Sequence, residues 1–236
     1  MRTFLILLII GTANFSAQNL LSPTNVKLDS KYIQDESSEV SWTMENAGSK
    51  FEIGKVTTDF KKLNKKDLLI KTTVKMKQSP EAWVDSTIVK ISNFQPVYHS
   101  SLNSMRNMSI RFNKNKATGY YLDKKTQKKD MIDEATTSPY FDSNSYPALI
   151  RFLPLKENYT TEISIFDYNP TAKKGVIKAY IEKVEKSEYN GKKVWVVKTT
   201  DDIQDRKTES TYYIDIDSRK VLKQEINAGG RKMIME

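Results

Sequence analysis

The chain has 236 residues, a formal net charge of +9, 38% hydrophobic and 28% charged residues, and no cysteine. This length is typical of one or two domains, and the hydrophobic content allows a core beneath a strongly solvated surface. The lack of cysteine excludes disulfides, thiolate metal sites, a cysteine nucleophile and lipid attachment at cysteine.

The first residues have the pattern of a secretory signal. Met1-Arg2 is short and positive, and the apolar run Phe4 to Ile10 falls short of the ~20 residues that span a bilayer. We predict a signal peptide over residues 1–17, with an uncleaved anchor as the alternative. A cysteine-free exported chain is more typical of a bacterial periplasm or exterior than of a eukaryotic secreted domain. Residues 18–36 are polar, and we predict that they form a flexible N-terminus of the mature chain.

Residues 37–236 are predicted to form a single β-rich domain. Segments such as 67–77 and 208–216 alternate apolar and polar residues, which is typical of half-buried strands. Asn190-Gly191 accepts positive φ at both positions and is a strong hairpin signal. We therefore expect about twelve antiparallel strands in one large curved sheet, mainly β in class.

One helical segment interrupts the strands between Ser138 and Pro154. Pro147 suits the first turn of a helix, and Pro154 stops it. Ala148, Leu149, Phe152 and Leu153 fall at helical spacing on one face, so we expect about two turns of helix packed against the sheet.

Arg151 is a single charge inside this apolar helix. Two interpretations are open. The side chain can extend along the surface to solvent over a strand edge. Alternatively, its planar donor fork can bind sheet carbonyls or a carboxylate and so anchor the helix.

The sequence offers little for catalysis or metal binding. His99 is the one histidine, no G-x-S-x-G motif is present, and a lone strand histidine is usually structural or exposed. Asp215 and Asp217 lack a calcium-loop pattern and are assigned to a turn. We therefore predict no catalytic residue, metal or cofactor. Six lysine pairs fall at turns or strand ends, where they protect sheet edges or, alternatively, attract an anionic surface. No nucleic-acid recognition motif is present.

The segment FDSNSYPALIRFLPLKENYTTEISIFD, followed by EKSEYNGKKVWVV, YYIDIDSRKVLKQEI and GGRKM, resembles an uncharacterised family of exported bacterial proteins of unknown function. The resemblance covers Phe51–Met235 and is specific from about Pro139. The matching positions are Asp142, Arg151, Leu153, Pro154, Asp167, Gly191 and Asp215.

The resemblance implies the incomplete β-barrel of the periplasmic lipoprotein carriers LolA and LolB, in which helices plug a curved sheet and an apolar cavity holds acyl chains. Leu149, Phe152 and Leu153 would then face that cavity. The chain has no motif specific to the carriers, so the resemblance does not imply lipoprotein transport.

We predict a non-enzymatic exported protein that binds a lipid or other amphiphile in a cleft between helix and sheet. The expected ligand-binding residues are Leu149, Phe152, Leu153, Trp195 and Tyr213, with Arg151 and Asp142 as structural anchors. The alternatives are a structural or protein-binding module of the cell envelope and, less favoured, a hydrolase. Possible partners are a lipid or an envelope protein, and no transmembrane segment is expected after signal cleavage.

Overall fold

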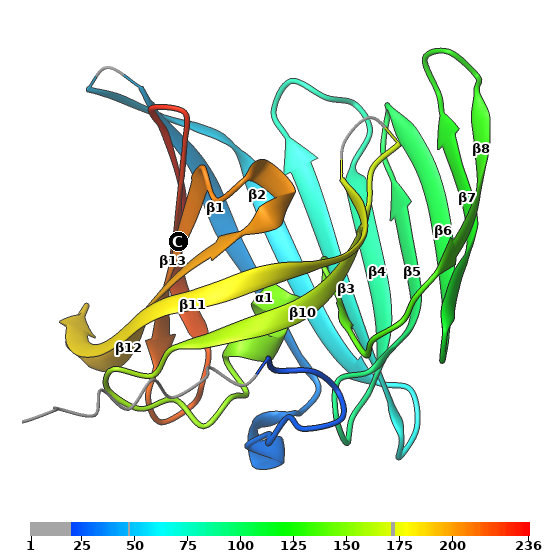
Figure 1. Ribbon diagram of the computed structural model, residues 1–236. Coiled ribbons are helices and arrows are strands. Elements are labelled where there is room, and N and C mark those ends of the chain that lie inside the picture. Colours follow the sequence, from blue (N-terminus) through cyan, green and yellow to red (C-terminus); the bar gives the residue numbers. More distant parts are fainter. Residues whose placement is uncertain (1–19, 47, 171–172) are drawn as a thin grey trace, which may run out of the picture.

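A computed structural model describes residues 20–46, 48–170 and 173–236, which form one open, curved sheet wrapped around a short helix (Figure 1). The predicted signal peptide, residues 1–17, lies outside these residues. The first eight strands are β1 Glu36–Asn46, β2 Ser49–Lys62, β3 Asp67–Met76, β4 Trp83–Lys90, β5 Pro96–Leu102, β6 Arg106–Asn113, β7 Lys116–Asp123 and β8 Lys129–Ala135. The others are β9 Phe141–Asp142, β10 Thr161–Tyr168, β11 Lys174–Tyr189, β12 Lys192–Asp201, β13 Thr208–Asp215, β14 Val221–Ala228 and β15 Arg231–Met235. The helix is α1 Tyr146–Ile150, and 3-10 turns lie at Ser30–Tyr32 and Asp202–Gln204.

The sheet consists of two meanders joined by one distant pairing. Strands β1 to β8 follow one another in space, as do β10 to β15, and β15 pairs with β1 so that Trp42 lies opposite Met235. The expected mainly β fold, with one large curved sheet and one short helix, is confirmed. The structure has fifteen strands rather than about twelve, and the two-residue β9 runs parallel to β10.

Local chemistry explains the long β11–β12 hairpin. Asn190 and Gly191 have φ of 49° and 73°, the left-handed region that a two-residue hairpin turn requires. Tyr189 pairs with Lys192 directly across that turn. The concave side of the sheet surrounds α1 (Figure 1). Because successive side chains of a strand point to opposite faces, every second residue of each strand lies on that side.

Residues 20–35, part of the segment 18–36 that is predicted to be flexible, make contacts with the rest of the fold. Leu21 bridges to Ile163 of β10, and its N–H donates to the Glu162 carbonyl at 2.8 Å. Ile33 is 1% exposed, and the Asp29 N–H donates to the Phe152 carbonyl at 2.8 Å. The segment therefore contributes backbone hydrogen bonds and one apolar side chain to the core.

Two hydrophobic clusters fill the concave side of the sheet. The larger one surrounds α1, where Phe152 packs edge-on against Phe60 with ring centroids 6.0 Å apart. The smaller one joins the two meanders. The ring centroid of Phe166 in β10 lies 5.7 Å from that of Phe112 in β6 and 5.3 Å from that of Tyr140. The ends of the sheet are thereby held near each other without closing into a continuous barrel. Within the described ranges, no helix has the length and apolar character needed to cross a membrane.

Candidate functional site

An apolar groove of 510 Å³ lies between α1 and the inner faces of β1–β3 and β13–β14. Its apolar wall includes Val40, Val56, Phe60, Ile70, Tyr212 and Val221. Pro147 and Ala148 form the helix side, and the wall also contains polar and charged side chains, among them Glu36, Arg151 and Lys220. The volume is within the roughly 300–1,000 Å³ that is usual for small-molecule sites.

Arg151 is part of this groove and is 4% exposed, so it does not reach solvent over a strand edge. Its Nη1 donates to the Glu36 carboxylate at the start of β1. Its guanidinium lies 5.1 Å from the ring centroid of Phe60 and 4.9 Å from that of Phe152. These contacts hold the end of α1 against β1 and β2, and they place a buried positive charge beside the apolar groove.

The groove is not lined by the residues that sequence analysis assigned to it. Leu149, Phe152 and Leu153 are at most 1% exposed and pack in the core. Only Leu149 of the three belongs to α1, and the residues of the helix segment that border the groove are Pro147, Ala148 and Arg151. Substitutions at the buried positions would therefore test folding rather than binding.

The two predicted aromatic residues also lie elsewhere. Trp195 is 7% exposed and belongs to the core around α1. Tyr213 packs against Tyr189 at 5.4 Å between centroids. Its neighbour Tyr212 is the residue that lines the groove, because successive side chains of a strand point to opposite faces.

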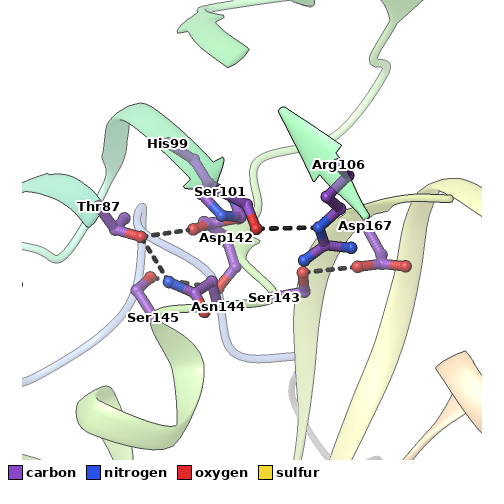
Figure 2. Close-up of polar contacts among 9 residues, drawn as sticks. All are labelled: Thr87, His99, Ser101, Arg106, Asp142, Ser143, Asn144, Ser145 and Asp167. Atoms are coloured by element: carbon purple, nitrogen blue, oxygen red, sulfur yellow. Dashed lines mark hydrogen bonds and ion pairs between the residues drawn. The ribbon is translucent and has the colours of Figure 1, made fainter. Parts of the chain in front are cut away.

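A polar network crosses from β4 and β5 to the loop that begins α1 (Figure 2). Asp142 at the end of β9 lies 3.1 Å from His99 Nδ1 through Oδ1, and its Oδ2 accepts a hydrogen bond from Thr87 Oγ1 at 3.1 Å. Asn144 Nδ2 donates to the same Thr87 hydroxyl at 2.9 Å. Asp142, which is predicted to be a structural anchor, therefore binds strands β4 and β5 of the first meander.

A second arm of the network joins β5, β6 and β10. Arg106 Nε donates to Ser101 Oγ at 2.9 Å, and Ser143 Oγ donates to Asp167 Oδ1 at 2.7 Å. Figure 2 shows the Arg106 guanidinium between Ser101 and Asp167. The strands place these groups together because β5 and β6 face β10 across the concave side.

Two groups in this network have shifted pKa values. Burial by itself lowers the pKa of His99, but the adjacent Asp142 carboxylate and, less strongly, Asp85 outweigh it, so the pKa is raised. Burial raises the pKa of Asp167, and the hydrogen bond from Ser143 offsets this only in part. Shifted pKa values of this kind cluster at functional sites.

Sequence reasoning missed most of this network. The available signal was the polar side chains at alternate positions, Asp85 and Thr87 in β4 and His99 and Ser101 in β5, which is the spacing of one strand face. All four are at most 8% exposed, which the sequence does not reveal. No group of three or more potential metal ligands is found in the part of the chain that the structure describes.

Comparisons with known proteins agree with this fold. A crystal structure of a beta-barrel-like protein of domain of unknown function DUF1849 from Brucella abortus superposes with a TM-score of 0.51. The match has 10% sequence identity and covers 86% of this chain and 95% of that one, so it shows likeness of fold alone. The search of curated proteins gives no match. The family model described as "Protein of unknown function (DUF3108)" matches residues 37–236, and the chain therefore belongs to the DUF3108 family.

Proposed function

We propose that this protein is a non-catalytic, exported binding protein that holds the apolar chain of a lipid or other amphiphile in the groove beside α1. The observation that carries the proposal is the 510 Å³ groove with a mainly apolar wall inside the curved sheet. Apolar cavities with a few polar groups at their margin are the usual form of a small-molecule site.

The distribution of charge supports an amphiphile rather than a fully apolar ligand. Arg151 and Lys220 lie in the same wall as Val56 and Val221. An acyl chain can occupy the apolar part, while its polar end stays near Lys220 and the Arg151–Glu36 ion pair. Export is supported by the apolar run at residues 4–10, which has the pattern of a secretory signal peptide.

Dodecanoate binding to the purified protein tests this proposal, measured by titration calorimetry and by native mass spectrometry after organic extraction. The critical variant is Ala148→Trp, because the half-buried Ala148 borders the groove and an indole there would fill it. We expect wild-type protein to bind dodecanoate and A148W to lose at least about tenfold in affinity, equivalent to ~1.4 kcal/mol.

The matched control is Ala135→Trp, since Ala135 is exposed at the end of β8 and outside the groove. It should bind dodecanoate as wild type does. No binding by wild type, or equal binding by A148W, would contradict the proposal.

A protein-binding role is the second candidate, and one observation favours it. Strand β8 is an edge of the sheet, and its Met131 is 72% exposed. An unpaired edge can accept a strand from a partner. Charged residues on β8, such as Lys129 and Asp133, oppose such pairing, so we place this function second. Cross-linking in cell-envelope extracts tests this second candidate. The protein-binding role would be favoured if wild type and A148W captured the same partner and neither bound dodecanoate.

A further inference from the structure

A second, smaller cavity of 170 Å³ lies between the inner face of β4–β6 and the β9–β10 edge of the sheet. Its polar wall includes Trp83, Asp85, His99, Arg106, Asp142 and Asp167. At ~30 Å³ for each water in the liquid, the cavity holds about as much as six water molecules. It therefore has room for a small polar group rather than for an acyl chain.

Three polar atoms of residues in this wall are buried and have no hydrogen-bond partner among the described residues. They are Trp83 Nε1, Asp85 Oδ1 and His99 Nε2. Asp85 is 8% exposed and His99 is 5% exposed. Buried polar groups in folded proteins are nearly always paired, so three unpaired atoms on the residues of one cavity wall point to a partner bound there.

The chemistry of the wall restricts what that partner can be. Trp83 Nε1–H can only donate, and Asp85 Oδ1 in its ionised form can only accept. His99 Nε2 accepts or donates according to its protonation, because Nδ1 faces Asp142. The missing partner must therefore offer both donors and acceptors within a small volume.

Neither an anion nor a cation suits all of these wall atoms. An anion would meet the carboxylates of Asp85, Asp142 and Asp167, and Asp85 has no cation in contact. The three carboxylates would attract a cation, but a cation cannot accept the hydrogen bond that Trp83 Nε1 donates, and it would meet the guanidinium of Arg106, which lies 5.7 Å from the Trp83 ring centroid. Hydroxyl groups suit both kinds of wall atom, because each hydroxyl donates one hydrogen bond and accepts two.

We propose that this cavity binds a neutral polyhydroxylated group, a sugar or glycerol unit, through Trp83, Asp85 and His99. The group is either a free molecule or the headgroup of the amphiphile in the groove. Asn144 belongs to the walls of both cavities, which places the two sites next to each other. The headgroup source rests on the proposed function, whereas the free source does not.

Indole N–H signals in nuclear magnetic resonance spectra give a direct test. The chain has three tryptophans, and Trp83→Phe assigns the Trp83 signal by its disappearance. Test ligands are glucose, dodecyl glucoside, dodecanoate and choline. We expect glucose or dodecyl glucoside to shift the Trp83 signal of wild type, and dodecanoate and choline to leave it unchanged.

Asp85→Leu is the critical variant, and Asp133→Leu on the exposed face of β8 is its control. Asp85→Leu should lose the shift while its melting temperature equals or exceeds that of wild type, because it removes a buried carboxylate whose Oδ1 has no partner among the described residues. A lower melting temperature, with the shift retained, would mean that Asp85 is structural and would overturn the proposal.

The remaining outcomes separate the two sources and the two proposals. If glucose shifts the Trp83 signal in Ala148→Trp as well as in wild type, the ligand is a free sugar. If only dodecyl glucoside shifts the signal, and the shift is lost in Ala148→Trp, the ligand is the headgroup of an amphiphile. If choline alone shifts the Trp83 signal, the inference is overturned. If none of the four ligands shifts it, the inference is also overturned, and water alone fills the cavity. Dodecanoate affinity of Asp85→Leu reports on the groove independently, so failure of one proposal does not imply failure of the other.

Discussion

The groove beside α1 and the cavity at His99 lie on the same concave face, but the inward-pointing residues around the groove are apolar and those around the cavity are polar. The inward positions of β2 and β3 around the groove carry residues such as Val56, Phe60 and Ile70. The corresponding positions of β4 and β5 around the cavity carry Asp85, Thr87, His99 and Ser101.

This difference shows that one curved sheet can hold two environments side by side. The apolar positions stabilise the fold by burial, at ~25 cal/mol per Å² of apolar surface. The polar positions are buried without contributing that term, and some of their atoms lack a partner. A region that gives up stability in this way is typical of a binding site.

Removing Asp142 should disrupt the polar region most strongly. In Asp142→Ala, His99 and Thr87 lose their shared partner in a buried environment, and the loss of one member of a buried pair destabilises by about 3–5 kcal/mol. The midpoint of urea unfolding measures this. Asp133→Ala, which breaks a surface pair with Lys116, should change stability by no more than about 1 kcal/mol, and equal effects of the two variants would be inconsistent with our account.

Arg151→Met, beside the apolar groove, should lower the unfolding free energy less than Asp142→Ala does. The variant leaves the Glu36 carboxylate without its cation, but Glu36 is 19% exposed and is partly solvated. We expect a loss of about 1–3 kcal/mol in unfolding free energy. A double-mutant cycle with Glu36→Gln checks the reason: the double variant should lose less than the sum of the single variants, and simple additivity would argue against the ion pair.

His99 should give the polar region a pH dependence that the apolar region lacks. Its pKa is raised in the folded state, so its contribution to stability is full below the unfolded pKa of about 6.5 and is lost as pH rises through the folded value. The difference in melting temperature between wild type and His99→Gln should therefore shrink with rising pH. The chain has one histidine, which keeps the measurement simple, and a difference that grew with pH would contradict the assignment.

Asp167→Asn should have the smallest effect, and it should be stabilising. Because burial raises the pKa of Asp167, the folded state favours the protonated form, and the contribution of this residue to stability is lost as pH rises through its folded pKa. At neutral pH the charged form is disfavoured, so the amide should raise the melting temperature slightly while keeping an acceptor for Ser143. In acid the two proteins should melt alike, and a lower melting temperature of the variant at pH 7 would refute this.

The sequence predicts the fold better than the site because strands and turns are local. Alternation within each strand and the Asn190-Gly191 turn are visible in a few consecutive residues. The residues that line the groove were not predicted, since five helical residues with mostly apolar side chains contain no signal of which of them the core will cover. The contact between His99 and Asp142 joins residues 43 positions apart, and no local pattern encodes it.

The pairing of β1 with β15 bears on the order in which the sheet assembles. Each meander can form from neighbouring segments, whereas the seam between Trp42 and Met235 closes a loop of almost the whole described chain. Long-range pairings of this kind slow folding, because chain entropy is lost before the contact is gained. We therefore expect the seam to form after the two meanders and, in native-state hydrogen exchange, to open before the β11–β12 hairpin. Slower exchange at the seam than in that hairpin would rule this order out.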